Sequence, residues 1–285
     1  MAYDFQAELK RVTDYYNGDP LQKRFSALIS GETNAGKTYM VRTARKPIHI
    51  DSFDPGGTKC LTDLIKSGDV IADTRWETED PYRPSAFAEW MKTTEIRMKM
   101  KYFDNFGTYV VDSLSTFGDA VMNYGMNLKQ RAGETPSRNK DYNPQKVYIV
   151  NKIRMLMNLP CDFILTAHLR EIEEIIGTRQ DGSEIKKTKY RLNVTGQAVM
   201  TLPLLFDELY VIIGTQGPNG PKREMLIDSL GTYIARSRLK KDGKQLNAKE
   251  EPDIKKLLQK TGFDNKDKPK LDTLAKDESK PSSLN

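Results

Sequence analysis

The chain has 285 residues, of which 38% are hydrophobic and 29% charged, so it is polar but carries enough apolar material for one sizeable core. Its 19 glycines and 14 prolines follow no period, which excludes a fibrous or collagen-like protein. The 45 basic and 39 acidic residues give a formal net charge of +6, which permits nucleic-acid binding without demonstrating it.

Other classes are excluded by what the chain lacks. Two histidines and two cysteines are too few for an all-protein zinc site or a disulfide framework. Cys60 and Cys161 lie beside apolar segments, which indicates buried free thiols in a reducing compartment. No apolar run approaches the roughly 18 to 20 residues of a membrane span, and the N-terminus does not resemble a secretory signal. We therefore expect a cytoplasmic protein with no membrane partner.

In the first part of the chain, short apolar runs alternate with stretches of helical periodicity. This pattern predicts helices at 5–16, 39–45, 58–67 and 86–102, and strands at 25–30, 47–51, 70–73 and 108–112. Strands that alternate with helices are typical of an α/β fold with a mainly parallel twisted sheet.

The second part is richer in strands and loops. Residues 114–128 are mixed in pattern, and 131–144 indicate a mobile loop. The pattern then predicts a helix at 145–159, strands at 162–167, 208–214, 225–228 and 232–235, a hairpin or excursion at 171–191, and a short helix at 253–260. The late strands predict antiparallel strands at the C-terminal edge of the sheet. The chain thus divides into an N-terminal helix (1–20), a core (21–245), a short C-terminal helix (246–262) and a disordered tail (263–285).

The most specific motif is a phosphate-binding loop of the form G-x-x-x-x-G-K-[ST]. Its two glycines permit backbone angles that a side chain would disfavour, so the loop N–H groups can point at phosphate oxygens. We expect Lys37 to pair with the β- and γ-phosphates and the Thr38 hydroxyl to bind Mg²⁺. The predicted ATP-binding residues are Gly31, Glu32, Thr33, Asn34, Ala35, Gly36, Lys37 and Thr38.

A second carboxylate is needed to hold the metal ion. The β-branched run at 108–112 ends in Asp112, which is the form of a Walker-B strand. Many buried strands end in Asp, so this pattern gains its weight from the loop at 31–38. We predict that Thr38 and Asp112 together bind Mg²⁺.

The loop, the segment Tyr109-Val110-Val111-Asp112-Ser113 and the segment Leu165-Thr166-Ala167-His168 together resemble RecA-like ATPases. The chain is similar to phage-encoded RecA-like ATPases grouped with single-strand annealing and recombination proteins, over residues 24–240. It shares with them Phe206-Asp207-Glu208 before a strand and an Ala-x-Ser-Arg ending at 235–238. The resemblance implies a RecA-like core, a Mg²⁺-dependent and DNA-stimulated ATPase, and a homo-oligomer, either ring or filament, with nucleotide between subunits. A phage origin would place it in the bacterial host cytoplasm.

The resemblance also implies roles for single residues. His168 would sense the γ-phosphate, and Arg236 and Arg238 would reach a neighbour's ATP as arginine fingers. RecA has a catalytic Glu after its second strand, whereas this chain has Phe53 at the aligned position. Asp54 is the nearest carboxylate and our candidate base, with Asp51 as the alternative.

Two loops of RecA-like proteins contact DNA. The first would fall within 117–144 and the second within 170–191. Lys and Arg bind phosphates without reading sequence, and Tyr142 or Tyr190 could stack on bases. The predicted contacts to single-stranded DNA are Lys129, Arg131, Arg138 and Lys140 in the first loop, and Arg170, Arg179, Lys186, Lys187, Lys189 and Arg191 in the second. A single-strand-binding protein is a further expected partner.

The sequence leaves other functions open. A RecA-core helicase or motor has the same core, although the chain is short for that role. A nucleotide-gated DNA-binding module with little turnover would fit the missing Glu. A metabolic P-loop kinase is disfavoured by the strand-rich C-terminal part, although fold analogy alone does not determine function.

Overall fold

The computed structural model describes residues 4–19, 23–137, 140–194, 198–217, 220–239 and 246–271. The helices are α1 (Phe5–Gly18), α2 (Lys37–Val41), α3 (Thr62–Lys66), α4 (Ala86–Lys99), α5 (Leu114–Asn127), α6 (Tyr142–Leu156), α7 (Ala198–Leu205) and α8 (Ile254–Thr261). The strands are β1 (Ser26–Gly31), β2 (Ile48–Ser52), β3 (Val70–Asp73), β4 (Thr108–Asp112), β5 (Asp162–Thr178), β6 (Glu184–Leu192), β7 (Glu208–Gly217), β8 (Gly220–Leu226) and β9 (Lys249–Glu250). Short 3-10 turns are η2 (Gly57–Leu61), η3 (Arg75–Glu77) and η4 (Tyr102–Asn105).

One sheet organises the molecule, in the strand order β3-β2-β4-β5-β1-β7-β8-β9. Strands β3, β2, β4, β5, β1 and β7 are parallel, and β8 and β9 are added antiparallel at one edge. The predicted α/β class, with a mainly parallel sheet and antiparallel C-terminal edge strands, is confirmed. The order also agrees with a RecA-like core, because the phosphate loop, the Asp112 strand and the His168 strand are neighbours.

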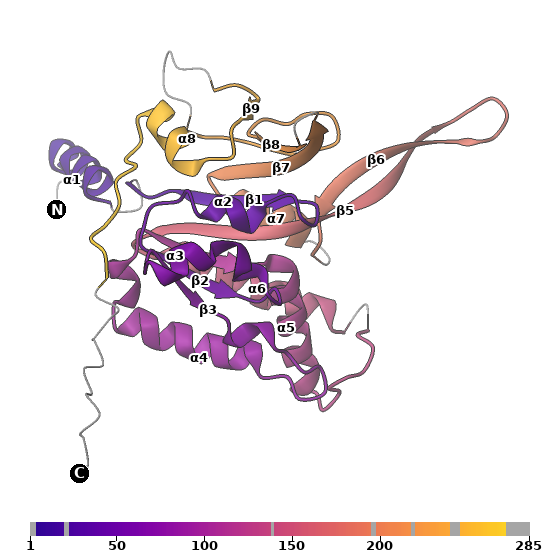
Figure 1. Ribbon diagram of the computed structural model, residues 1–285, viewed down its shortest axis with the longest axis horizontal. Coiled ribbons are helices and arrows are strands. Elements are labelled where there is room, and N and C mark those ends of the chain that lie inside the picture. Colours follow the sequence, from indigo (N-terminus) through magenta and orange to yellow (C-terminus); the bar gives the residue numbers. More distant parts are fainter. Residues whose placement is uncertain are drawn as a thin grey trace, which may run out of the picture.

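The core has two layers, one on each face of the sheet, because successive side chains of a strand point to opposite faces. Leu28, Tyr109 and Phe163 pack with the helices α4, α5, α6 and α7. Ala27 and Ile29 belong to the other layer, which includes residues of α2 and α8. Figure 1 shows α4, α5 and α6 grouped on one side of the sheet and α8 on the other. Because both faces are covered, the strands read as continuous apolar runs.

The longest excursion from this body is the hairpin of β5 and β6, which projects away from the rest of the molecule (Figure 1). Strand β5 begins inside the parallel sheet and continues without a break into the hairpin, so one strand serves both. The hairpin predicted at 171–191 is therefore confirmed, and it begins directly after His168.

Several local predictions differ from the structure. A strand was expected at 232–235, but the structure has isolated bridges there, Leu230 with Tyr233 and, just beyond the range, Leu209 with Arg236. Residues 114–128, read as mixed, are almost entirely the helix α5. Helix α2 ends at Val41, short of the predicted 45, and α7 was missed within an apolar run that contains Pro203. Cys161 is buried as expected, whereas Cys60 is exposed.

The chain stays attached to the core beyond α8. Phe263 packs against the apolar layer that contains α8, Lys46 N donates to Asp267 at 2.7 Å, and Lys268 N donates to the Lys46 carbonyl at 2.8 Å. The disorder expected from residue 263 therefore does not apply to 263–271, whose polar side chains find partners on the core. Residues 272–285 lie outside the described residues.

Helix α1 stands apart from this body (Figure 1). Asp4 caps it by accepting from the backbone N–H groups of Gln6 and Ala7, and none of its residues is buried. In the described part of the chain, no helix is long and apolar enough to cross a membrane.

Candidate active site

The phosphate loop lies between β1 and α2 and has the backbone that its glycines permit. Gly36 has φ 99°, in the left-handed region that favours glycine. A Cβ at Gly31 would lie 2.8 Å from the Ile212 carbonyl oxygen, so the loop can start only from a residue without a side chain. Lys37 is buried, and its Nζ donates to the carbonyls of Gly31 at 3.2 Å and Glu32 at 2.9 Å. Burial lowers the pKa of Lys37 despite the nearby carboxylates. The lysine is held over the loop, where phosphate oxygens would replace the carbonyls as its partners.

Asp112 closes the site from the end of β4. Thr38 Oγ1 donates to Asp112 Oδ2 at 2.8 Å, and Thr166 Oγ1 donates to Oδ1 of the same carboxylate. Burial and the charge of Asp54 raise the pKa of Asp112, against the lowering effect of its threonine donors and Lys37. A cation at this position would restore the ionised form.

The pairing of Thr38 with Asp112 fits a magnesium ion. Within the described residues, no group of three or more His, Cys, Asp or Glu side chains forms a metal cage. Mg²⁺ needs no such cage, because it is usually bound through one or two protein oxygens, waters and the phosphates of its nucleotide. Thr38 and Asp112 could supply those oxygens, and a bound ion would neutralise phosphate charge.

Asp54, His168 and Lys37 form a connected chain of polar groups. His168 Nδ1 lies 3.3 Å from Lys37 Nζ, and His168 Nε2 lies 3.1 Å from Asp54 Oδ2. Since a lysine ammonium can only donate, Nδ1 accepts and Nε2 carries the proton that it donates to Asp54. Asp54 Oδ1 also accepts from Ser113 Oγ at 2.9 Å and Thr116 Oγ1 at 2.5 Å. Burial raises the pKa of Asp54, but these hydrogen bonds, that of His168 first, bring it below its usual value.

The alternative base, Asp51, has a different role. It is completely buried and accepts from His49, Trp76, Trp90, Arg97 and Tyr109. Although burial raises its pKa, the histidine, arginine and tyrosine hold it far below the usual range. Phe53 is also buried and stacks on Trp76. Asp51 is thus a structural hub inside the core, and of the two aspartates only Asp54 faces the phosphate loop.

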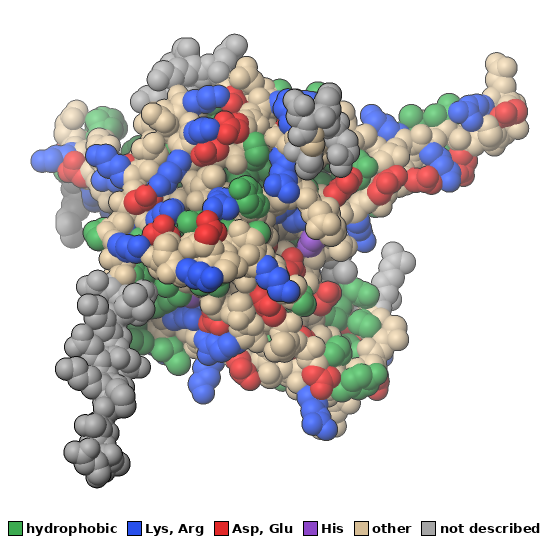
Figure 2. All heavy atoms as spheres, viewed as in Figure 1, with side chains coloured by type: hydrophobic (Ala, Val, Ile, Leu, Met, Phe, Trp, Pro, Cys, Tyr) green, Lys and Arg blue, Asp and Glu red, His purple; other side chains and the backbone are tan. Residues whose placement is uncertain are grey.

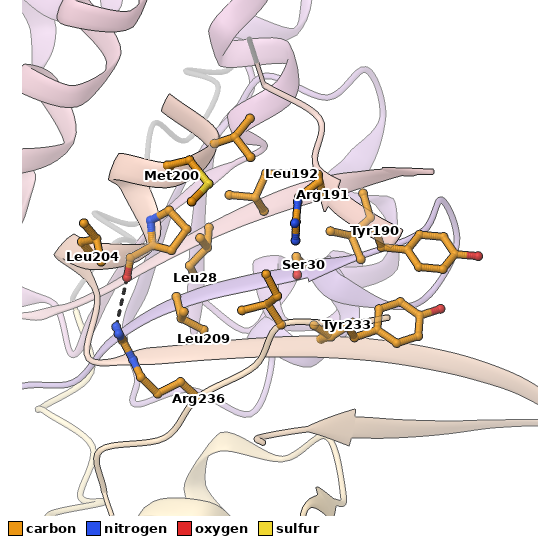
Figure 3. A pocket seen from close by; sticks show the side chains of 15 residues that line it. Leu28, Ser30, Tyr190, Arg191, Leu192, Met200, Leu204, Leu209, Tyr233 and Arg236 are labelled. Atoms are coloured by element: carbon orange, nitrogen blue, oxygen red, sulfur yellow. Dashed lines mark hydrogen bonds between the residues drawn. The ribbon is translucent and has the colours of Figure 1, made fainter. Parts of the chain in front are cut away.

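The two predicted finger residues lie beside the start of β7, the neighbour of β1, whereas the phosphate loop follows the opposite end of the parallel strand β1. The backbone of Arg236 pairs with Leu209 at the start of β7, and its guanidinium donates to the carbonyls of Pro203 (3.0 Å) and Phe206 (2.7 Å). It therefore caps the C-terminal end of α7, as Figure 3 shows. Arg238 is about half exposed and lies 3.4 Å from Asp207. Neither arginine therefore contacts the phosphate loop of its own chain in the described residues.

The cations of the first predicted DNA loop have a partner within the chain. Lys129 Nζ lies 2.6 Å and Arg131 Nη1 3.0 Å from the buried Asp141 carboxylate. The lysine above all lowers the pKa of Asp141. Lys140 contributes its backbone carbonyl to Lys129, and Arg138 lies outside the described residues. These charges tie the loop together, so the first loop presents less free positive charge than its composition suggests.

The second loop keeps more of its charge available. Opposite residues of an antiparallel pair share a face, so Arg170 with Arg191, Ile172 with Lys189, and Glu174 with Lys187 lie on one side of the hairpin. Lys186 lies on the other side with Glu171 and Glu173. One face therefore carries four cations and one acid, which pairs with Lys189. Figure 2 shows this mixture of basic and acidic side chains along the projection. Arg179 lies beyond a register shift near Ile175, at the tip.

Two features of the site were missed from the sequence, and one predicted residue has another partner. Ser113 and Thr116 hold Asp54, and a short polar side chain after a strand gives no signal of that role. Arg223 of β8 stands over the phosphate loop, where a Cβ at Gly36 would lie 2.7 Å from its Nε. Tyr190, predicted to stack on bases, is stacked on Tyr233 with ring centroids 4.6 Å apart.

A family model described as an AAA domain matches residues 23–239. The chain belongs to this AAA-domain family. It is thus an ATPase of the P-loop class, in agreement with the loop, the Asp112 strand and the sheet order. The crystal structure of a KaiC-like protein from the hyperthermophilic archaeon Pyrococcus horikoshii OT3 is similar at 12% identity and a TM-score of 0.40, over 75% of this chain and 81% of that one. No curated protein matches the chain.

Proposed function

We propose that this AAA-domain protein binds and hydrolyses ATP while acting on single-stranded DNA, as a homo-oligomer in recombination, annealing or repair. The observation that carries the proposal is the continuity of β5. Residues 162–167 of β5 lie in the sheet, His168 lies between Lys37 and Asp54, and the strand then forms one side of the charged hairpin. The phosphate site and the charged projection thus share one element. The likeness to phage recombination proteins supports the choice of DNA over other polyanions.

In this proposal the site residues divide the chemistry. The loop N–H groups and Lys37 hold the phosphates, and Mg²⁺ between Thr38 and Asp112 neutralises charge on them. Asp54, ionised because its pKa is below the usual value, accepts a proton from the attacking water. Ser113 and Thr116 orient that carboxylate, and His168 contacts the γ-phosphate.

DNA binding is proposed to use the hairpin face with Arg170, Lys187 and Lys189. Such contacts are made to phosphates, so the affinity decreases as salt increases. The test is fluorescence anisotropy with a labelled oligothymidine over a range of salt. A triple variant, Arg170→Ala with Lys187→Ala and Lys189→Ala, should bind more weakly. Its slope of log affinity against log salt should be smaller by roughly 0.7 for each phosphate that the variant no longer neutralises.

The hairpin offers a matched control for this experiment. Lys186→Ala removes one cation from the other face, where Lys186 pairs with Glu173 at 2.9 Å. Its affinity and salt slope should stay close to those of the unmodified protein. Equal losses in both variants would contradict a specific face, and no loss in either would exclude the hairpin from DNA binding.

Self-association is proposed to use α1. At helical spacing, Phe5, Leu9, Val12 and Tyr16 form one apolar stripe, and each of these side chains is at least half exposed. The core offers a complementary groove of about 250 Å³ whose apolar lining includes Leu28, Met200, Leu204 and Leu209 (Figure 3).

The charges of this groove also fit α1. The lining contains Arg191 and Arg236 but no acidic residue, and the buried Nε of Arg236 has no hydrogen-bond partner in the described residues. Glu8 flanks the stripe of α1, where it pairs with Arg11 of the same helix at 2.7 Å and would exchange this partner for an arginine of the groove. We therefore propose that α1 of one copy occupies the groove of the next.

The oligomer is tested by sedimentation velocity with and without ATP. Leu9→Ser with Val12→Ser should shift the protein to monomer, and so should Leu204→Asp in the groove. Lys10→Ala, on the opposite face of α1, is the control and should assemble normally. Assembly of all variants like the unmodified protein would contradict this interface.

A nucleotide-gated DNA-binding module with little turnover is the second candidate. It is favoured by one observation, the burial of Phe53 where RecA-like enzymes place a glutamate. Steady-state ATP hydrolysis with and without single-stranded DNA separates the two. DNA-stimulated turnover supports the proposal, tight ATP binding without turnover supports the module, and strand unwinding would indicate a helicase.

A further inference from the structure

A pair of planar side chains lies on the outer side of the phosphate loop. Arg223 of β8 is exposed, and its side chain stands directly on Gly36, with Nε and Cδ 2.7 Å and 2.8 Å from the position of a Cβ there. The Arg223 guanidinium carbon also lies 5.5 Å from the ring centre of Tyr39. Tyr39 directly follows Thr38, and its side chain is 45% exposed. The two groups thus form a flat, accessible surface beside the loop.

Arg223 differs from its neighbours in having a free charge. Arg42 lies over the same tyrosine ring at 4.7 Å, but its guanidinium pairs with Asp63 at 2.6 Å. Lys222 and Glu224, next to Arg223 on β8, pair with each other at 3.0 Å. Within the described ranges, no acidic side chain pairs with Arg223. An unpaired guanidinium next to a phosphate-binding loop is suited to a nucleotide.

The sheet order shows which end of a nucleotide would reach Arg223. Asp54, Asp112 and His168 come from β2, β4 and β5 or the residues that follow them, on one side of β1. These residues surround Lys37 and define the γ-phosphate end. Arg223 comes from β8, on the other side of β1. A nucleotide whose terminal phosphate lies at His168 therefore extends its nucleoside toward Tyr39 and Arg223.

We propose that Arg223 and Tyr39 bind the nucleoside end of ATP, with the guanidinium plane of Arg223 stacked on the nucleobase. The inference rests on the proposed ATP binding and adds the residues that hold the base. Guanidinium and aromatic planes both stack on π-systems, and every nucleobase offers such a face. Arg223 and Tyr39 should therefore increase the affinity for ATP and for ADP alike, but not the affinity for a ligand that has no nucleobase.

The test compares ATP, ADP and inorganic tripolyphosphate by isothermal titration calorimetry. Arg223→Ala should weaken ATP and ADP about five- to tenfold, as expected when one cation–π or stacking interaction is removed, and leave tripolyphosphate unchanged. Arg223→Lys keeps the charge without the plane and should show most of the same loss. Lys222→Ala, on the same strand, is the matched control and should bind all three normally.

Each result has one interpretation. If Arg223→Ala lost as much affinity for tripolyphosphate as for ATP, Arg223 would contact phosphate, and the proposed stacking on the nucleobase would be wrong. Unchanged binding of all three ligands would remove Arg223 from the site. Lys37→Ala should weaken all three ligands. If the unmodified protein bound none of them, the proposed ATP function itself would fail, and that outcome differs from a failure of the Arg223 assignment alone.

Discussion

The sharpest test of the site is Asp54→Asn. The substitution preserves shape but replaces Oδ2, 3.1 Å from His168 Nε2, with an amide that would place a donor against a donor. The Oδ1 oxygen can still accept from Ser113 and Thr116. The change therefore removes the negative charge and one hydrogen bond while leaving the backbone of the site in place.

The two expected effects differ greatly in size. Loss of one hydrogen bond to a charged group costs about 1.5 to 3 kcal/mol, less than the usual 5 to 15 kcal/mol stability of a domain. The variant should therefore fold. Removal of a general base lowers turnover about 10² to 10⁴-fold. We expect kcat for ATP to fall by at least about 100-fold, with ATP affinity changed less than about threefold because the phosphates bind to the loop and Lys37.

The assay is steady-state ATP hydrolysis with saturating Mg²⁺, accompanied by calorimetric ATP binding and thermal unfolding. Because the pKa of Asp54 is below its usual value, this base is ionised throughout pH 5 to 8, and kcat of the unmodified protein should show no acid limb from Asp54 there. Turnover of Asp54→Asn within about threefold of the unmodified protein, with intact folding, would refute the assignment. The attacking water would then be activated by another group.

Two other residues give predictions of a different kind. Asp51→Asn leaves the buried Arg97 and its neighbours without their carboxylate and should destabilise the protein by about 3 to 5 kcal/mol in urea unfolding. The pKa of Asp51 is lower in the folded than in the unfolded protein, so ionised Asp51 stabilises the fold fully above about pH 4, the unfolded pKa, and this stabilisation is lost as the pH falls further. The free energy of unfolding of Asp51→Asn should therefore fall less steeply at acid pH than that of the unmodified protein. An equally steep fall would contradict the role of Asp51 as a structural hub. Thr38→Ala should raise the Mg²⁺ concentration needed for ATP hydrolysis, because it removes an oxygen that binds the metal ion. Thr38→Ser keeps the hydroxyl and should need the same Mg²⁺ concentration as the unmodified protein. Equal Mg²⁺ titrations of the two variants would exclude Thr38 as a metal ligand.

The elements predicted best from the sequence are those whose local signal and tertiary environment agree. Strands at 70–73 and 108–112 have the predicted bounds. The second is a β-branched run buried on both faces of a parallel sheet, whereas the first is a half-buried edge strand in which only Val70 is buried. The phosphate loop was predictable because the backbone conformation of the loop itself requires its glycines. Gly31 and Gly36 show this directly, through the approach of Ile212 and a φ of 99°.

The remaining features depend on contacts between distant segments. Asp51 and Asp54 are three residues apart and chemically identical in sequence, and only the tryptophans and Arg97 around Asp51 separate their roles. From the sequence, Lys129 and Arg131 were predicted to bind nucleic acid, but in the structure both pair with the carboxylate of Asp141. Arg223 was overlooked because it lies almost two hundred residues from the loop that it covers, and no local pattern marks a guanidinium that stands on a glycine.

The continuity of β5 has a thermodynamic consequence. If the hairpin binds single-stranded DNA and the ATP at Lys37 and His168 changes that affinity by some factor, DNA must change the ATP affinity by the same factor. The coupling cannot operate in one direction alone, whatever the hydrolysis rate. Paired titrations, DNA binding with and without ATP and ATP binding with and without DNA, therefore test the link between hairpin and phosphate site without relying on turnover. A factor near one in both directions would show that β5 joins the two regions in space but not in energy.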